Sequence, residues 1–268
     1  MKLQAPKPVA IRAVHPNAGV MAWYANRLQD WLDAMHDSLK LHIEAAYKRE
    51  PPTIGMAHDA SSTVALRKAL KLWGDRWRSK FDEMSQTLAE QFAAKSFKTT
   101  QISMMDALKQ GGFTVAFKPT AKSIEAYRAV VNANVGLIKS VPVQYLKDVE
   151  QSVWNSVMAG GDLATLSKSL QQNYGVSYKR AAIIARTENG KATAIIQATR
   201  QQELGLKQAI WLHSGGGRVP RPTHVAMSGK PFDLGKGMWD RDERSWVFPG
   251  QLINCRCVSK ALIPGFDD

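Results

Sequence analysis

The sequence predicts an α+β protein: a mainly helical N-terminal region with a long helical hairpin, followed by a small C-terminal α+β module with an antiparallel sheet. Two observations predict this class. Between residues 16 and 204 the apolar residues recur at steps of three and four, as on the buried face of a helix. After Gly205 they alternate in short stretches separated by turn residues, as in strands. A helical scaffold is therefore expected to precede a compact module.

The chain carries an excess of basic residues. Its 268 residues include 36 Lys and Arg against 23 Asp and Glu, which gives a formal net charge of +13, and 44% of the residues are hydrophobic. That hydrophobic fraction is sufficient for a sizeable core and argues against global disorder. The charge favours nucleic acid or an acidic protein surface as a partner. The alternative is that the charge only keeps the protein soluble.

Neither a membrane segment nor an export signal is expected. No apolar run approaches the roughly 18 residues of a membrane helix. The charged stretch from Met1 to Pro8 is not followed by a hydrophobic region, so it does not resemble a signal peptide. Cys255 and Cys257, one residue apart, are not expected to bond to each other. Synthesis in a reducing compartment, the cytoplasm, is therefore expected.

Residues 1–15 are expected to form an extended basic arm. Pro6 and Pro8 prevent a regular helix there, and Lys2, Lys7 and Arg12 supply the charge. The segment could equally be a frayed terminus.

Residues 16–115 are expected to form a helical hairpin that anchors the protein. The first helix runs from Pro16 to about Glu50 and is ended by Pro51-Pro52. The second starts at Ser61 or Ser62, either of which is a good N-cap. Its apolar residues form a near-heptad seam: Leu66, Leu70, Trp73, Trp77, Phe81, Met84, Leu88 and Phe92. The aromatic residues could instead stack on nucleic-acid bases, but their helical spacing favours core packing.

A compact layer of short helices is expected next. The expected pieces are a short helix ended by Gly111-Gly112, an extended stretch over 113–117, helices over 124–138 and 143–157, a brief helix over 162–170 and a helix over 178–204. The breaks rest on Pro142, Gly160-Gly161 and Tyr174-Gly175, which are local helix-ending signals. Gly190 costs about 1 kcal/mol relative to alanine in a helix, which predicts close packing against another segment.

The C-terminal module is expected to be a small antiparallel sheet packed against the last long helix. Residues 208–213 and 255–263 alternate like strands, and Gly215-Gly216-Gly217 reads as a turn. Between them lies a turn-rich region with spaced aromatic residues. These are Phe232, Trp239, Trp246 and Phe248.

The sequence offers weak candidates for chemistry. Arg186, Thr187 and Glu188 lie on three faces of a helix, so they cannot all contact one ligand. An arginine and a glutamate beside a sheet also resemble the pair in ADP-ribosyltransferases, although the strand context of that family is missing. Residues 240–244 form a mixed charge run, expected to be a solvated turn rather than a Mg²⁺ or acid–base site. No nucleophile elbow or P-loop is present, so neither a cofactor nor an enzymatic activity is expected.

Metal binding near the C-terminus is a further possibility for the site. His224, Cys255 and Cys257 are the candidate ligands, but zinc pairs commonly have two to four residues between ligands. Their tighter spacing predicts no metal. Instead, the cysteines are expected to be small buried residues on a strand, with His224 hydrogen-bonded nearby.

The motifs of the last third resemble the phage head morphogenesis family, the minor head proteins of the phage Mu F type. The residues that carry the resemblance are Arg186, Thr187, Glu188, Trp211, Arg221, His224, Pro249, Gly250, Asn254, Cys255, Arg256 and Cys257. The terminal Asn-Cys-Arg-Cys after Pro-Gly is the most specific part. Residues 116–268 are expected to form the minor head protein domain.

Membership would imply a minor capsid protein inside the virion head, bound to the portal protein or the major capsid protein. It would also imply roles in head assembly, genome packaging or genome ejection, and would carry no catalytic residues. Many relatives have a second cysteine pair where this chain has Arg221 and His224, which argues against an intact metal site.

The expected partner besides capsid proteins is double-stranded DNA, bound without sequence preference. Candidate phosphate contacts cluster on the second helix and are Arg67, Lys68, Lys71, Arg76, Arg78 and Lys80. Two alternatives stay open. One is a metal-dependent hydrolase or injected effector that uses His224, Cys255 and Cys257, and the other is an adaptor that contacts protein only.

Overall fold

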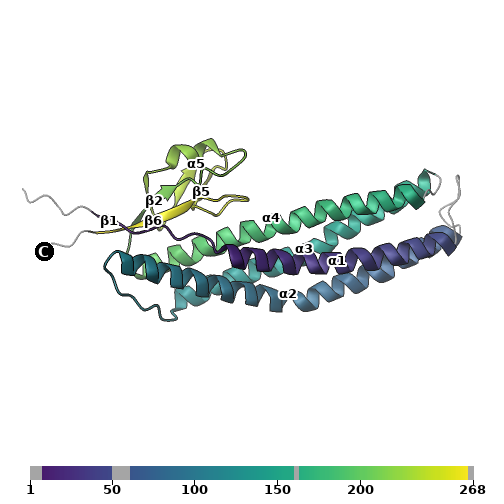
Figure 1. Cartoon of the computed structure of the whole chain (residues 1–268), viewed down its shortest axis with the longest axis horizontal. Coiled ribbons are helices and arrows are strands. Elements are labelled where there is room, and N and C mark those ends of the chain that lie inside the picture. The colour runs from purple at the N-terminus through teal and green to yellow at the C-terminus, as the bar shows by residue number, and fades with distance from the viewer. Residues whose placement is uncertain (1–7, 50–60, 160–162, 265–268) are drawn as a thin grey trace, which may run out of the picture. The chain divides into compact units, whose positions relative to one another are not determined.

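The computed structural model describes residues 8–49, 61–159 and 163–264 (Figure 1). The chain divides into two compact units. The sheet unit comprises Met1–Ala22, Glu90–Val131 and Ala185–Asp268, and the bundle unit comprises Trp23–Ala89 and Asn132–Ile184. Long helices followed by a small antiparallel sheet confirm the predicted α+β class.

Within the described residues, four long helices make up the helical part. They are α1 (Ala18–Arg49), α2 (Ser61–Gln110), α3 (Ala121–Met158) and α4 (Leu163–Glu203). The first helix and the start of the second agree with the prediction. Pro51-Pro52, Gly160-Gly161 and Asp162, which were expected to end or cap helices, lie outside the described residues.

In the bundle unit, helical segments of α1 to α4 lie side by side (Figure 1). The predicted apolar face of α1 is buried through Leu28, Leu32, Met35, Leu39 and Ile43. This buried face of α1 contacts α3 and α4 as well as α2, the partner expected in the hairpin. Its ring contacts reach α2, where Trp31 meets Phe81 edge-on at 5.5 Å, while its polar groups reach α3 and α4. The two seams therefore close a bundle rather than an isolated hairpin.

The expected layer of short helices is wrong. α2 continues to Gln110, because Phe92, Ala93, Met104 and Leu108 remain on a buried face. Its end is as predicted: Gly112 adopts φ +90°, and the amide of Phe113 donates to the Leu108 carbonyl. Residues 113–117 form no strand, although Phe113, Val115 and Phe117 pack on the core of the sheet unit.

Two predicted helix ends are overridden by packing. α3 passes through Pro142, whose missing amide is offset by buried neighbours, among them Val141 and Tyr145. α4 passes through Gly175, because the preceding Tyr174 is fixed on α1. Its hydroxyl donates to the Asp33 carboxylate at 2.7 Å. Tertiary contacts thus outweigh local helix-breaking signals.

We expect mild acid to destabilise the bundle unit through His36. The imidazole is buried, and its Nδ1 lies 2.6 Å from the hydroxyl of Tyr145. Burial lowers the pKa of His36 below 6.5, more than Asp37 and Gln171 raise it. Because the folded pKa is lowered, this contribution to stability is complete above pH 6.5 and is lost as the pH falls through the folded value.

The measurement is the melting temperature between about pH 7 and about pH 5, the range in which histidine titrates. The wild-type chain should lose more stability over this range than His36→Gln, which keeps a polar group beside Tyr145. Asp33, Asp37 and Lys40 also influence His36 and are present in both proteins. If the melting temperatures of the two proteins fall equally between these pH values, His36 is not the cause of the acid sensitivity.

The sheet unit contains a four-stranded antiparallel sheet of order β1-β6-β2-β3. Its strands are β1 (Val9–Ala10), β2 (Gln208–Leu212), β3 (Pro231–Asp233) and β6 (Val258–Ile263). β2 pairs with β6 from Gln208 opposite Leu262 to Leu212 opposite Val258. The strand expected over 208–213 is confirmed, whereas the closing strand starts at Val258 and excludes both cysteines.

The predicted arm contributes to this sheet. Val9 and Ala10 pair with Ile263 and Leu262, and the amide of Ile11 donates to the Ala261 carbonyl at 3.1 Å. The described part of the arm is therefore extended, as expected, and its Ile11 side chain is buried in the core.

A second, two-stranded sheet pairs β4 (Met238–Asp240) with β5 (Ser245–Val247). The core between these elements is apolar and includes Leu108, Ala209, Trp211, Phe232, Leu234, Val247, Ala261 and Ile263. Among the described helices, none has a stretch long and apolar enough to cross a bilayer.

Candidate functional site

A short helix presents the first residue of the site. α5 (Pro222–Met227) begins after the extended Arg221, and Pro222 occupies its first turn, where the missing amide hydrogen is not needed. Thr223 and His224 are the buried residues of this helix. His224 packs edge-on against Trp211 of β2, with the ring centroids 4.9 Å apart.

The loop before β6 is held against α4 by close backbone packing. A Cβ on Gly190 would lie 3.4 Å from the Gly250 carbonyl oxygen and 3.5 Å from that of Cys255. This contact is the close approach that Gly190 predicted. Gly250 itself has φ +85°, a conformation that favours glycine. The Asn254 amide donates to the Thr187 hydroxyl at 3.1 Å, which adds a second attachment.

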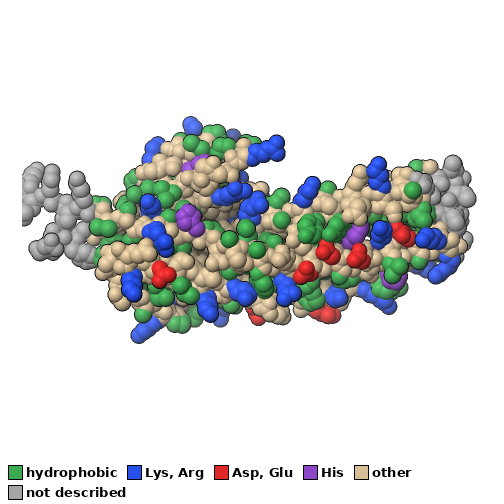
Figure 2. Space-filling view, viewed as in Figure 1, with side chains coloured by type: hydrophobic (Ala, Val, Ile, Leu, Met, Phe, Trp, Pro, Cys, Tyr) green, Lys and Arg blue, Asp and Glu red, His purple; other side chains and the backbone are tan. Residues whose placement is uncertain are grey.

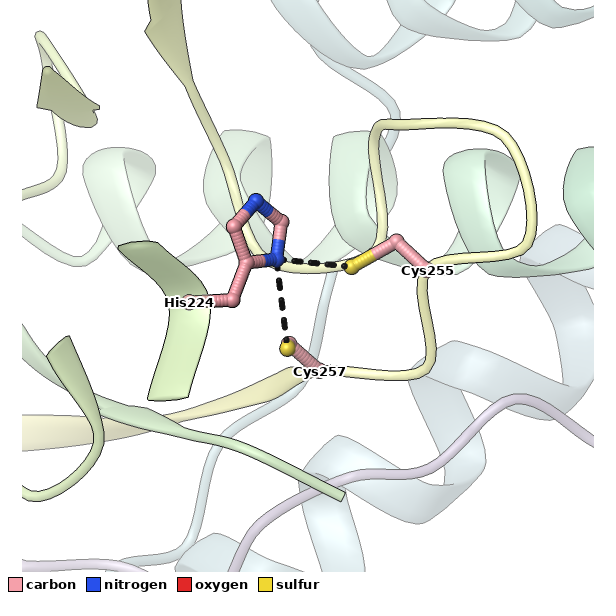
Figure 3. Close-up of side chains that lie close together, drawn as sticks. All are labelled: His224, Cys255 and Cys257. Carbon is pink, nitrogen blue, oxygen red and sulfur yellow. Dashed lines mark hydrogen bonds between the residues drawn. The ribbon is translucent and has the colours of Figure 1, made fainter. Parts of the chain in front are cut away.

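This loop brings both cysteines to His224 (Figure 3). Cys255 Sγ lies 3.4 Å and Cys257 Sγ 3.5 Å from the same atom, His224 Nδ1. All three residues are buried, and the three potential ligand atoms lie within 4.8 Å of one another. The expectation that the cysteines lie on a strand is wrong. Asn254 instead adopts φ 58°, and the turn directs both sulfurs to one side.

A buried carboxylate fixes the other side of the imidazole. Asp240 Oδ2 lies 3.1 Å from His224 Nε2 and also accepts from the Thr223 hydroxyl. Asp240 Oδ1 accepts from the amides of Asp242 and Glu243. Burial raises the pKa of Asp240. The hydrogen bonds and His224 together lower it by more, so the pKa lies below its usual value. The carboxylate therefore orients the imidazole ring, with Nε2 toward Asp240 and Nδ1 toward the two sulfurs.

The position of Asp240 differs from the sequence-based prediction. The charge run over 240–244 was expected to be a solvated turn, and Arg241 to Arg244 are indeed exposed. Asp240 is fully buried. It was missed because no sequence signal separates it from the solvated acidic residues beside it.

The two thiols differ in acidity. A hydrogen bond from Cys257 lowers the pKa of Cys255 to about 4, and His224 lowers it further while burial opposes the shift. The same hydrogen bond, together with burial, raises the pKa of Cys257. The Trp211 side chain and the Ser214 backbone act in the opposite direction on Cys257. The hydrogen bond between the two buried thiols therefore favours ionisation of Cys255 over that of Cys257.

The remaining motif residues organise the surrounding loops. Arg256 donates to the Gly216 carbonyl at 2.7 Å, and Arg221 donates to the Ile253 carbonyl at 3.2 Å. Glu188 is buried and pairs with Lys191 at 2.9 Å. Arg186 lines a groove of about 740 Å³, together with Arg256. Arg186, Thr187 and Glu188 therefore have different neighbours, as their helical spacing predicts.

The candidate DNA contacts do not belong to this site. All six lie on α2 within the bundle unit and are exposed. Arg76 and Lys80 lie over the rings of Trp73 and Trp77, and Arg78 pairs with Asp75. Trp73 is half-buried and Trp77 is buried, which agrees with the prediction that the aromatic seam packs in the core.

Comparison with known proteins identifies one family. Residues 147–260 match the family model described as "Phage Mu protein F like protein". The predicted resemblance of the C-terminal third is thereby confirmed.

Two curated relatives match as well. A Haemophilus influenzae protein described as "Uncharacterized protein" is 28% identical over 254 residues, which cover 92% of this chain and 53% of that protein. The "NAD(+)--arginine ADP-ribosyltransferase EFV" of Enterococcus faecalis is 25% identical over 135 residues, covering 46% of this chain and 28% of that protein. The chain thus spans about half the length of the first relative and less of the second. No solved structure matches.

Proposed function

We propose, from the premise that residues 147–260 carry a Phage Mu protein F like domain, that the chain is a minor head protein of a tailed phage. That family match is the observation on which the proposal rests. Its proposed location is the inside of the virion head, at the portal protein or the inner capsid surface. Its proposed role is in head assembly, genome packaging or genome ejection.

The direct test is the protein composition of purified heads from the phage that encodes this chain. Mass spectrometry should detect the chain in DNA-filled heads, in fewer copies than the major capsid protein. Cross-linking within intact heads should join it to the portal or to the capsid shell. Its absence from purified heads would overturn the proposal, whereas cross-links to capsid protein alone would exclude only the portal contact.

The basic surface supports contact with packaged DNA. The net charge is +13, and Lys and Arg side chains outnumber acidic ones on the face shown in Figure 2. Arg67, Lys71 and Arg78 are spaced so that they share one face of α2, where they line a hollow of about 250 Å³ with Asp75 and Glu150. Contacts of this kind neutralise phosphates without reading base sequence.

We expect neutralising two of these lysines to weaken the salt dependence of DNA binding. Each phosphate contact contributes about −0.9 to the slope of log Kobs against log salt for duplex DNA. The double variant Lys68→Gln/Lys71→Gln should therefore flatten the slope by roughly two units, measured by fluorescence anisotropy on a random-sequence duplex.

The matched control is Lys95→Gln/Lys98→Gln. It removes two exposed charges at the same spacing on the same helix, but in the sheet unit. If both variants flatten the salt slope equally, DNA binding depends on the overall positive charge and not on the six candidate residues of α2. Salt-independent binding by the wild type would contradict DNA contact and leave an adaptor that binds protein only.

The second candidate, a metal-dependent hydrolase or injected effector, required His224, Cys255 and Cys257 to converge, and they do. Asp240 supplies no acid or base beside the sulfurs, because its oxygens are engaged by Nε2 of His224, Thr223 and two amides. The geometry therefore favours a structural centre.

The partial match to the Enterococcus faecalis ADP-ribosyltransferase does not support that activity in this chain. The match covers 28% of that protein. Glu188, the candidate for such chemistry, is buried on a helix and paired with Lys191.

A further inference from the structure

We propose that His224 Nδ1, Cys255 Sγ and Cys257 Sγ bind one zinc ion, which ties α5 to the loop before β6. The proposal goes beyond the proposed function and does not depend on it. It also revises the expectation of no metal, which rested on the short Cys-x-Cys spacing and on His224 being a single ligand where a second pair is common. That spacing becomes compatible with ligation because the Asn254 turn, rather than a strand, presents the two sulfurs.

The distances fit a tetrahedral ion. Zinc–sulfur bonds of about 2.3 Å and zinc–nitrogen bonds of about 2.0–2.1 Å place the nitrogen about 3.6 Å from each sulfur in a tetrahedron. The observed distances from His224 Nδ1 to Cys255 Sγ and Cys257 Sγ are 3.4 and 3.5 Å. An ion can therefore enter with small side-chain shifts. In Figure 3 both sulfurs face the same ring nitrogen, as two ligands of one ion would.

The surroundings provide the support that a metal ligand needs. Histidines that bind metals usually donate their other ring N–H to a carboxylate or a carbonyl. Asp240 is that carboxylate, at 3.1 Å from His224 Nε2, and it is held in turn by Thr223. A buried histidine that only filled space would not need a buried, fully hydrogen-bonded carboxylate on its far nitrogen.

An unsatisfied donor points to the same conclusion. The indole N–H of Trp211 is buried and makes no hydrogen bond of normal geometry to any of the residues that the structure describes. The Cys257 side chain is its neighbour. A buried donor without a partner is unfavourable, and a zinc-bound thiolate, which carries more negative charge than a thiol, would accept from it.

The chemistry of the donor set selects zinc over hard ions. Two sulfurs and one imidazole suit zinc and other soft or borderline ions, whereas Mg²⁺ and Ca²⁺ prefer oxygen. The fourth position faces a cavity of about 40 Å³, lined by the three ligands and by Arg221 and Asn254 among others. A space of that size accepts a water molecule as fourth ligand, since one water needs about 10–15 Å³.

The ion would act as a cross-link. His224 comes from α5, 31 residues before Cys255 and 33 before Cys257, which leads directly into β6. Between these segments lie the β4–β5 hairpin and the loop that packs on Gly190. Ions that bind only the folded arrangement stabilise it by mass action.

The first test uses the wild-type full-length chain. We expect one zinc ion per chain by elemental analysis, and X-ray absorption distances with two sulfurs at about 2.3 Å and one imidazole nitrogen at about 2.0–2.1 Å. Replacement by cobalt should give the charge-transfer and d–d bands of a tetrahedral thiolate site. Removing zinc should lower the melting temperature, and adding it back to about a hundred times Kd should raise it by about 5–10 °C.

The second test uses variants that separate ligands from their neighbours. Cys257→Ser and His224→Gln should abolish stoichiometric binding, and Asp240→Asn should weaken it by about 10–100-fold. His213→Gln is the control, because His213 lines the same cavity but is not among the convergent ligands, and it should bind like the wild type.

Three results would overturn the proposal. They are zinc well below one ion per chain after reconstitution, an absorption spectrum without sulfur neighbours, and an unchanged melting temperature on zinc addition. All three are read on the wild type, so they decide the question even if a variant fails to fold. None of them bears on whether the chain is found in phage heads.

Discussion

Truncating Trp211 to alanine is expected to lower the free energy of unfolding of the sheet unit by about 3–5 kcal/mol, the range measured for buried aromatic residues. Trp211 is fully buried and is among the largest side chains of this core. It lies on β2 opposite Ser259 of β6 and packs edge-on against Phe232, with centroids 5.8 Å apart. Because its other ring contact is His224, the loss should also loosen the thiol–imidazole cluster.

Urea unfolding followed by far-ultraviolet circular dichroism measures this effect. Trp246→Ala is the matched control, since that ring is 44% exposed and contacts Trp239 of the adjacent strand and the Lys236 ammonium. The control should cost about 1 kcal/mol, the size of one exposed aromatic pair. Comparable losses in the two variants would show that Trp211 is not central to the core.

Arg200→Ala is expected to destabilise the sheet unit by a similar amount, about 3–5 kcal/mol, because it leaves the largely buried carboxylate of Glu203 without its charged partner and with only the Thr120 hydroxyl as a side-chain donor among the described residues. The Arg200 side chain is 4% exposed and pairs with Glu203 at 2.6 Å. It also donates to the Lys118 carbonyl at 2.9 Å, and its guanidinium lies over the ring of Phe117. Arg200 thereby fixes the segment after α2 onto α4.

The control for this variant is Arg27→Ala. Arg27 pairs with Asp30 at 3.8 Å, and both side chains are more than half exposed, at 55% and 61%. Exposed pairs contribute about 0–1 kcal/mol, so the control should be almost neutral in the same urea experiment. Restoring stability to Arg200→Ala by the second change Glu203→Leu would support the cause, whereas an additive loss would contradict it.

The buried face of α1 followed from spacing alone. The steps of three and four through Leu28, Leu32 and Leu39 identified the residues that are buried in α1. The α2 start at Ser61 and its end at Gly111-Gly112 also followed from local signals. These predictions succeeded because the buried face and the helix cap depend on neighbours a few residues away.

Helix breaks were predicted poorly for the opposite reason. Pro142 and Gly175 are unfavourable inside a helix by local propensity. Contacts from distant parts of the chain, such as the Tyr174–Asp33 hydrogen bond, keep the helix continuous past them. No local pattern contains that information.

For the candidate site, too, some features were predicted from the sequence and others were not. The order of motifs from Arg186 to Cys257 was enough to predict a resemblance to the family, and the family-model match over residues 147–260 confirms that resemblance. The close approach at Gly190 was also predicted, although its partner, the Gly250 loop, was not.

What the sequence determined by itself is the residue types and their periodicity: helical faces, a turn-rich sheet module, two cysteines and an excess of positive charge. What only the tertiary structure decided is which of them meet. The φ of 58° at Asn254 directs the two sulfurs together, α5 carries His224 to them, and the fold buries Asp240 behind its ring. Metal ligation requires atoms within a few ångströms of one point, and that convergence depends on long-range packing rather than on spacing along the chain.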